Sequence, residues 1–229
     1  MRIHRLSLLE GARRARGVAV AIDVLRASSH IVTLFDQGVR AVVPAATLTR
    51  ARELKQEHPG WILAGERHGL PPEGFEMGNS PVEAVRRDLE GRTVILTTSA
   101  GSRGMVAAAE AGARVLVGCF LNARSVAEYL RRLAPAEVSL LALGADGTRP
   151  APEDEGAAAY IEALLEGRPF DLEAVFATIR SHPEGRKFLD PDQPNYRAED
   201  LEACLRADRV AQVPQLRGDR LEAGSEEIG

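Results

Sequence analysis

The sequence "TVILTTSAGSRGMVAAAEAGARVLVG", residues 93–118, contains the unit from which the fold can be predicted. It begins with a short, nearly continuous apolar run and ends with a second one, "RVLVG". Between them, "MVAAAEAG" has the composition of a helix that ends at a glycine. Two apolar strands joined by a helix form a βαβ unit, which places the strands parallel to each other in one sheet.

The same alternation recurs along the chain. The predicted strands are residues 18–23, 39–44, 61–65, 93–98, 114–118 and 138–144. Most are continuously apolar, as expected of strands covered on both faces. After residue 144 the pattern is helical, and the chain ends in polar residues. We therefore predict an α/β protein with a mainly parallel or mixed sheet, flanking helices and a helical C-terminal third. A single domain is expected over residues 1–216, followed by a frayed tail over residues 217–229.

Composition and charge argue against several classes of protein. The 229 residues are 45% hydrophobic and 27% charged, which is typical of soluble globular domains. The formal net charge of −4 provides no basic field for nucleic acid. The sequence shows neither an apolar signal segment nor a run of about 18 apolar residues, so we predict a cytoplasmic protein without membrane contact. Cys119 and Cys204 lack metal-ligand spacing and are predicted to be core residues.

Ligands of open α/β sheets bind beyond the carboxyl ends of the strands. The first of the six predicted strands ends in "DVLRASS", which places Asp23, Arg26, Ser28 and Ser29 at a strand-to-helix turn. An aspartate turn followed by a serine cap would explain the same residues structurally. Both interpretations stay open at this strand.

A long loop, "GERHGLPPEGFEMGNSP", comes after the third of these strands over residues 65–81. Glu66 and Arg67 lie at its start, and its glycines permit close approach to a ligand. Asn79 and Ser80 precede a proline, a sequence typical of a helix N-terminus that can bind an anion. A capped surface loop without a ligand is the structural alternative.

The fourth of these strands ends in "TTSAGSRG", residues 97–104, where hydroxyls and glycines precede a helix. Backbone N–H groups and hydroxyls in such a loop can bind one anion. The loop lacks the lysine of a Walker A motif and the third glycine of a dinucleotide fingerprint, so nucleotide binding is not favoured. The residues predicted to contact the anion are Thr98, Ser99, Gly101, Ser102 and Arg103.

Two further strand ends carry polar residues. Asn122 lies after the fifth predicted strand and is either a substrate contact or a helix cap. Asp146, Glu153 and Asp154 lie after the sixth. Carboxylates at this position are suitable ligands for Mg²⁺, although they would equally suit the first turn of a solvated helix. Together, the five strand ends favour an anionic substrate and a hard metal ion.

Four motifs, in this order, resemble the 2-phosphosulfolactate phosphatase family, the ComB-like phosphatases. They are "AIDVLRASS" (21–29), "LAGERHGLPPEGFEMGNSP" (63–81), "VILTTSAGSRG" (94–104) and "VGCFLNARSVAEYL" (117–130). The resemblance implies a ComB-like α/β fold and Mg²⁺-dependent hydrolysis of 2-phospho-3-sulfolactate to 3-sulfolactate and phosphate, a step of coenzyme M biosynthesis. The chain departs from the family pattern at His68, Glu76 and Ala100. Ala100 stands where the family has asparagine, whose amide could contact the substrate. The resemblance therefore supports the reaction class more strongly than it supports this particular substrate.

This resemblance, together with the residue types, leads to a set of predicted roles. The metal ligands are expected to be Asp23, Glu66 and Asp154. Asp23, Arg26, Glu66 and Arg67 are the predicted catalytic residues, with arginine forks binding the oxyanions of the substrate. The predicted substrate contacts are Ser28, Asn79, Ser80, Thr98, Ser99, Gly101, Ser102, Arg103 and Asn122.

Other functions remain compatible with the sequence. The partner is expected to be a small anionic phosphate ester, and self-association is compatible with an enzyme of this size. A phosphatase of another small phosphorylated hydroxy acid is one alternative. A non-catalytic protein that binds an anionic metabolite is another. Attack by water is favoured over a phospho-aspartate at Asp23, because no second aspartate lies two positions further on.

Overall fold

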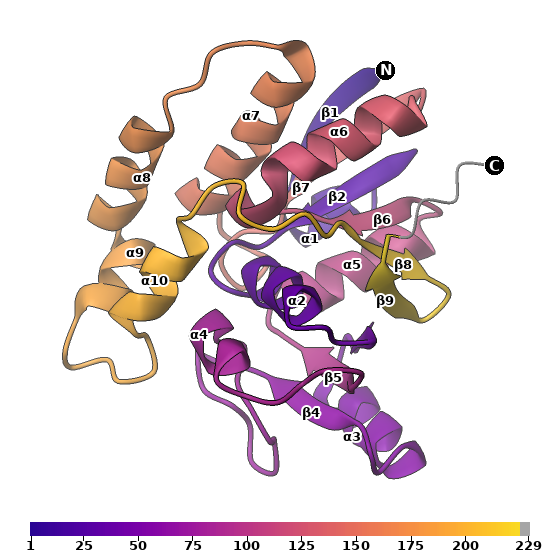
Figure 1. Ribbon diagram of the computed structural model, residues 1–229, viewed down its shortest axis with the longest axis vertical. Coiled ribbons are helices and arrows are strands. Elements are labelled where there is room, and N and C mark those ends of the chain that lie inside the picture. The colour runs from indigo at the N-terminus through magenta and orange to yellow at the C-terminus, as the bar shows by residue number, and fades with distance from the viewer. Residues whose placement is uncertain (225–229) are drawn as a thin grey trace.

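The computed structural model describes residues 1–224, which form an α/β structure around one nine-stranded sheet (Figure 1). The strands are β1 (Arg2–Ser7), β2 (Val18–Ile22), β3 (Ala41–Pro44), β4 (Ile62–Gly65), β5 (Thr93–Thr97), β6 (Arg114–Val117), β7 (Glu137–Ala142), β8 (Pro214–Arg217) and β9 (Arg220–Ala223). The helices that precede β6 are α1 (Leu8–Ala12), α2 (Ala27–Asp36), α3 (Leu48–Glu57), α4 (Pro81–Val85) and α5 (Gly101–Glu110). Those that come after β6 are η1 (Phe120–Asn122), α6 (Ala123–Leu133), α7 (Pro152–Glu166), α8 (Leu172–Ser181), α9 (Pro183–Arg186), η2 (Lys187–Leu189) and α10 (Ala198–Cys204).

The strand order is β1-β7-β2-β6-β8-β9-β3-β5-β4. Two groups of parallel strands, β1-β7-β2-β6 and β3-β5-β4, are joined by β8 and β9, which pair antiparallel with their neighbours. Helices α2 and α6 cross the near face of the sheet in Figure 1, and α1 and α5 lie behind it. All six predicted strands are present, so the predicted α/β class with a mixed, mainly parallel sheet is confirmed.

The predicted frayed tail is wrong for the residues that form β9. Leu221 is fully buried and pairs with Val42 of β3, while β8 pairs with β6. Arg217 and Arg220 pair across a two-residue turn in which Gly218 has φ 61°, a conformation that favours glycine. The C-terminal hairpin therefore lies in the middle of the sheet. Residues 225–229 of the predicted tail are outside the described residues.

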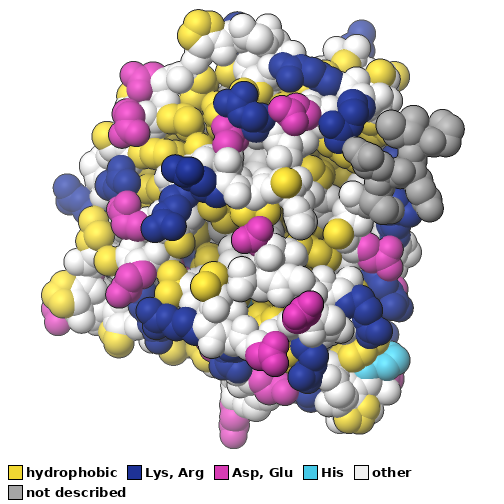
Figure 2. Space-filling model, viewed as in Figure 1, with side chains coloured by type: hydrophobic (Ala, Val, Ile, Leu, Met, Phe, Trp, Pro, Cys, Tyr) yellow, Lys and Arg dark blue, Asp and Glu magenta, His cyan; other side chains and the backbone are white. Residues whose placement is uncertain are grey.

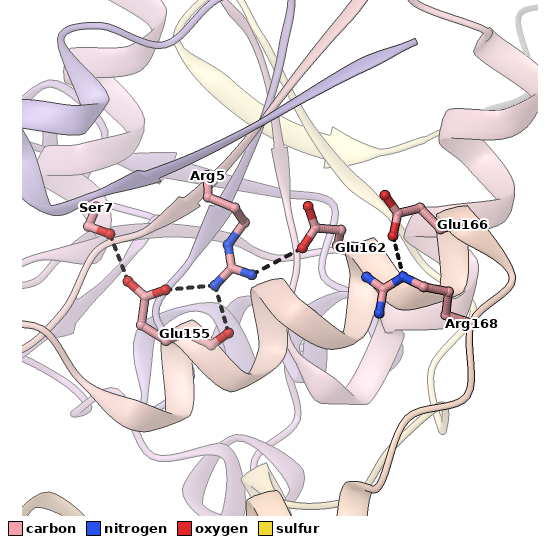
Figure 3. A network of polar contacts seen from close by, with 6 residues as sticks. All are labelled: Arg5, Ser7, Glu155, Glu162, Glu166 and Arg168. Atoms are coloured by element: carbon pink, nitrogen blue, oxygen red, sulfur yellow. Dashed lines mark hydrogen bonds and ion pairs between the residues drawn. The ribbon is translucent and has the colours of Figure 1, made fainter.

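The N-terminal strand β1 was also missed. Its sequence contains only two apolar residues, Ile3 and Leu6, and none of its six residues is buried, which suits an edge strand better than a central one. Arg5 of β1 contacts Glu155 and Glu162 of α7, and Ser7 donates a hydrogen bond to Glu155 (Figure 3). These contacts attach the first turn of α7 to the edge of the sheet. The helix that carries Glu153 and Asp154 thus begins at a fixed position.

The helix start predicted after Asn79 and Ser80 is confirmed, because Ser80 caps α4 through the N–H of Glu83. Thr47 caps α3 in the same way, through the N–H of Arg50. Helix α5 begins at Gly101 rather than after the glycine-rich loop, so this loop forms its first turn. None of the helices within residues 1–224 is long and apolar enough to cross a membrane. Basic and acidic side chains are interspersed over the described part of the face in Figure 2.

His30 of α2 lies completely inside the structure. Its Nδ1 lies 3.1 Å from the carbonyl oxygen of Ser80, and its Nε2 has no partner among the described residues. Burial lowers the pKa of His30 to about 4 from an ordinary value of 6.5. The folded protein therefore holds this ring neutral under conditions in which the unfolded chain would protonate it.

We predict that this histidine makes the protein less stable as the pH falls from about 6.5 towards 4. In that window the unfolded state binds a proton that the folded state does not bind, so the free energy of unfolding falls by about 2 kcal/mol between pH 7 and pH 5. His30→Asn, which keeps a donor for Ser80, should lose this part of the pH dependence in urea denaturation. The same substitution at the exposed His58 should retain it, and equal pH dependence in all three proteins would contradict the assignment.

Candidate active site

A small polar cavity lies where four predicted strand-end loops meet. It has a volume of about 80 Å³, room for several water molecules. Its walls come from the loops after β2, β4, β5 and β7, and from α9 and the segment that connects it to α10. Of the predicted site residues, it is lined by Asp23, Arg26, Glu66, Asn79 and Ser99. We call it the carboxylate cavity, after Asp23 and Glu66.

Asp23 lies directly after β2 and is only 8% exposed. Its carboxylate accepts the N–H of Ala27 at 3.3 Å at the start of α2. Burial, followed by the charge of Glu66, raises the pKa of Asp23 from 3.8 to about 7. A Cβ on Gly101 would lie 2.8 Å from Asp23 Oδ2 and 2.5 Å from the Cβ of Ala27. Gly101 is therefore required for the close approach of the β5 loop to Asp23.

Glu66 connects the loops after β4 and β5. Its Oε1 accepts the N–H of Ser99 at 2.7 Å, and its Oε2 accepts the N–H of Gly69 at 3.1 Å. The hydroxyl of Ser99 lies 3.4 Å from the same Oε2. These hydrogen bonds fix the carboxylate of Glu66 beside that of Asp23. Neither carboxylate forms an ion pair with a residue in the described part of the chain. Two carboxyl groups thus face one cavity.

Arg26 forms the wall of the cavity that adjoins the C-terminal helices. Its Nη1 donates to Asp200 at 2.8 Å, and its Nη2 donates to the carbonyl oxygen of Gly69 at 3.2 Å. The guanidinium lies 5.7 Å from the ring centre of Phe188 and 5.6 Å from that of Tyr196. A guanidinium has five N–H donors, so donors remain for an anion in the cavity. Its position is fixed before any ligand binds.

Asp200 of α10 is the most important site residue that the sequence analysis missed. It is completely buried, and besides Arg26 it accepts the hydroxyl of Ser80 at 2.6 Å and the N–H of Val82 at 3.2 Å. One carboxylate thus joins the starts of α2 and α4 to α10. A signal was present in the sequence, because Asp200 falls beside Leu201 on the buried face of an amphipathic helix.

The segment from α9 to α10 contributes a further wall that was not predicted. Glu184 lies 3.5 Å from Arg149 and forms an ion pair with Lys187. Both cations line the carboxylate cavity, together with Phe188 and Tyr196. The residues of this segment do not lie at a strand end, so the rule that identified the other loops did not apply to them. The helical C-terminal part therefore completes the site.

Asp154 does not join Asp23 and Glu66 in a metal cluster. Its Oδ1 accepts the N–H of Val24 and its Oδ2 accepts the N–H of Gly144, both at 2.7 Å. Burial and the charges of Asp23 and Glu153 raise its pKa well above the ordinary value. Among residues 1–224, no group of three or more His, Cys, Asp or Glu side chains is arranged to hold a metal ion. The geometry instead indicates that Asp154 holds the β2 and β7 loops together.

Several predicted contacts serve the loops rather than the cavity. Ser28 accepts the N–H of Asp23 at 2.9 Å. Thr98 and Ser102 close the β5 loop through two reciprocal hydrogen bonds. The residues of the predicted set that do not line the carboxylate cavity are Ser28, Arg67, Ser80, Thr98, Gly101, Ser102, Arg103, Asn122 and Asp154. Most of them position a neighbour that does line it.

The remaining predicted side chains can be placed in the same way. Arg67 donates to the carbonyl oxygen of Glu66 and to Thr97 Oγ1, and it is not part of the cavity lining. Arg103 donates to the carbonyl oxygen of Ser99. Asn122 does not cap α6, because its amide bonds the N–H of Cys119 and the carbonyls of Val117 and Gln212. It lies apart from the site, where it connects β6 to the segment before β8.

The two remaining acidic candidates differ from each other. Glu153 is 4% exposed, and its Oε2 has no partner among the described residues. Burial, and then the charges of Glu184 and Asp23, raise the pKa of Glu153 to about 7. Asp146 lines the cavity and is paired with Arg149 at 3.2 Å.

The donors present fit a magnesium ion held by two carboxylates. Mg²⁺ prefers hard oxygen ligands and binds through one or two carboxylates, with the remaining positions filled by water and substrate phosphate. Asp23 and Glu66 share a cavity and carry no ion-pair partner within residues 1–224, and burial, together with repulsion by Glu66, raises the pKa of Asp23. A divalent cation would relieve that repulsion. Asp154, with both oxygens bound to backbone N–H groups, is not needed for this.

We predict that Asp154→Ala destabilises the fold whether or not metal is present. It would leave two buried N–H groups without partners, at a cost of about 1–3 kcal/mol for each group. The matched change Asp88→Ala removes an exposed carboxylate and should change the stability by less than about 0.5 kcal/mol. Urea denaturation with Mg²⁺ and with EDTA measures both. Unchanged stability in EDTA, together with the loss of stabilisation by Mg²⁺, would show Asp154 to be a ligand.

Comparison with known proteins agrees with the motifs. Residues 3–219 match the family described as 2-phosphosulpholactate phosphatase. The chain is 32% identical over 225 residues to the "Probable 2-phosphosulfolactate phosphatase" of Carboxydothermus hydrogenoformans, a match that covers 94% of this chain and 93% of that protein. A protein of the same name from Caldicellulosiruptor saccharolyticus is 32% identical over 217 residues, or 87% and 88% of the two chains.

A shorter match involves the protein of that name from Deinococcus radiodurans. It is 37% identical over 148 residues, which cover 65% of this chain and 61% of the relative, less than two thirds of its length. The family match includes all four strand-end loops of the carboxylate cavity and reaches into the C-terminal hairpin. The chain therefore belongs to the 2-phosphosulfolactate phosphatase family, a family of phosphoric monoester hydrolases.

Proposed function

We propose that the protein hydrolyses 2-phospho-3-sulfolactate to 3-sulfolactate and phosphate with the help of Mg²⁺. The observation that carries the proposal is the pair of carboxylates, Asp23 and Glu66, which face one polar cavity and form no ion pair with any described residue. The names of the relatives support the substrate. An acidic substrate alone would be repelled by this pair, so the carboxylates require a cation between them and the phosphate.

Asp23 and Glu66 would hold the ion, which would supply polarisation of a phosphoryl oxygen and activation of a water molecule. Phosphoryl transfer otherwise needs positioning and charge stabilisation. Arg26 offers its remaining N–H donors to phosphate oxygens from a buried position fixed by Asp200. Phe188 and Tyr196 pack against this guanidinium and limit the access of water on that side. In the proposed hydrolysis a water oxygen would bond to phosphorus as the bond between phosphorus and the ester oxygen breaks. The water would lose a proton and the leaving alkoxide would gain one, which gives 3-sulfolactate and phosphate.

A second substrate is favoured by one specific observation. Ala100, one of the three positions at which the chain departs from the family pattern, lines the carboxylate cavity. A methyl group there offers no hydrogen bond to a substrate oxygen. Hydrolysis of another small phosphorylated hydroxy acid is therefore the alternative, with the same metal and the same carboxylates.

The proposal predicts Mg²⁺-dependent phosphate release that needs Asp23. Phosphate release from racemic phosphosulfolactate, 3-phosphoglycerate and p-nitrophenyl phosphate should be highest for phosphosulfolactate, should cease in EDTA and should return with Mg²⁺. Asp23→Asn should lower kcat by at least ~10²-fold, the scale of a lost electrostatic group in a catalytic site. Asp88→Asn, the same change at an exposed residue remote from the cavity, should retain wild-type turnover.

The outcomes separate the candidate functions. Faster release from another hydroxy-acid phosphate would keep the phosphatase and replace its substrate. Full activity of Asp23→Asn, or full activity of the wild type in EDTA, would contradict the proposed site. No release from any ester by folded protein would favour a protein that only binds an anionic metabolite.

A further inference from the structure

The side chain of Asn79 is buried beside the carboxylate cavity and lacks a partner. Asn79 is 4% exposed, and its Oδ1 has no hydrogen-bond partner among the described residues. A buried amide oxygen without a partner costs about 1–3 kcal/mol, so such groups are rare unless a ligand or water completes them. Ser80 fixes the backbone next to it by capping α4 and bonding Asp200. The backbone beside Asn79 is therefore fixed, whereas its amide oxygen has no partner within residues 1–224.

Asn79 lies between the carboxylate cavity and a second, larger chamber. This second chamber has a volume of about 310 Å³ and lies beside the first. The two share Arg26, Gly69 and Asn79 as lining residues. The far wall of the second chamber includes Asn195 and Arg197, from the segment that leads into α10. A ligand that extends past Arg26 from the carboxylate cavity would enter this space.

The charges around the second chamber leave one cation uncompensated. Arg26 is paired with Asp200, and the two glutamates of its wall are paired with Lys55 and Arg87. Arg149 and Lys187, on the carboxylate cavity, are both paired with Glu184. Among the cations of the two walls, Arg197 alone forms no ion pair with any described residue, and it is exposed at the chamber. The second chamber thus favours an anion, whereas the carboxylate cavity favours a cation.

We propose that Asn79 and Arg197 form a subsite for the acidic end of the substrate. The inference rests on the proposed function and extends it. The phosphate lies at Asp23 and Glu66, and a carboxylate or sulfonate of the same molecule passes Arg26 and binds the Asn79 amide and the Arg197 guanidinium. Rotation of the amide group directs its N–H donors to the anion, and the guanidinium fork suits a planar or tripodal oxyanion. The pair selects phosphate esters of small acids over those of neutral alcohols.

The test compares two esters that differ in their acidic groups. Phosphosulfolactate carries a carboxylate and a sulfonate, whereas glycerol 2-phosphate carries two hydroxymethyl groups at the corresponding positions. Arg197→Gln should raise KM for phosphosulfolactate about tenfold, the effect of losing one hydrogen bond to a charged group. The increase for glycerol 2-phosphate should be several times smaller. Asn79→Ala should shift the ratio of the two kcat/KM values in the same direction.

A matched control uses Arg186→Gln, because Arg186 is exposed, lies nearby in sequence and lines neither chamber. This substitution also removes one positive charge, and it should leave the ratio of the kcat/KM values for the two esters at the wild-type value. Equal effects of Arg197→Gln and Arg186→Gln would overturn the subsite. An equal loss of kcat/KM for both esters in the Arg197 and Asn79 variants would also overturn it.

A binding measurement separates this inference from the proposed function. Calorimetric titration of the full chain with 3-sulfolactate, which carries no phosphate, should show binding that weakens about tenfold in Arg197→Gln and stays unchanged in Arg186→Gln. If no ester is hydrolysed but this pattern holds, the subsite stands and the phosphatase does not. If hydrolysis is normal but 3-sulfolactate binds both variants equally well, the phosphatase stands and the subsite is wrong.

Discussion

The arrangement of the site depends on two like charges held together in a buried cavity. Removing carboxylates from water is costly unless hydrogen bonds or a counter-charge compensate them. Glu66 receives backbone N–H groups from its own loop and from Ser99, and Asp23 receives that of Ala27. These bonds stabilise the groups but do not remove their repulsion, which contributes to the raised pKa of Asp23. The fold therefore holds the carboxylates in a state that a cation stabilises.

Much of the surrounding structure keeps this pair in place. Gly101 allows the β5 loop to reach Asp23, and Asp154 holds the β2 and β7 loops through two backbone N–H groups. Asp200 joins α10 to Arg26 and Ser80, so the last helix is part of the site. The C-terminal hairpin joins the two parallel groups of strands that carry the loops. Residues far apart in the chain thus determine the geometry of one small cavity.

Local sequence patterns predicted the central strands and several site residues. They failed for elements whose structure depends on pairing with residues far away in the sequence. The apolar strands, and the convergence of Asp23, Glu66 and Ser99 at their ends, are consequences of βαβ periodicity and of the geometry of parallel sheets. The hairpin β8–β9 was missed because its strands are short and polar in sequence, and only pairing with β6 and β3 buries them. Asp154 and Asn122 bind backbone groups of neighbouring loops. Residue type alone could not show this, because carboxylate and amide side chains can equally bind a metal ion or a substrate. Lys187 and Arg197 do not lie at a strand end, so no local rule identified them.

The central claim is that Asp23 and Glu66 bind the metal ion without Asp154. It is tested most directly by the anomalous scattering of Mn²⁺ in crystals of the wild-type protein soaked with Mn²⁺ and inorganic phosphate. We expect one anomalous peak in the carboxylate cavity, with Asp23 and Glu66 oxygens as its protein ligands. The hydrogen bonds of Asp154 to Val24 and Gly144 should remain unbroken. A peak coordinated by Asp154 or Glu153 instead, or no peak at millimolar Mn²⁺, would contradict the claim.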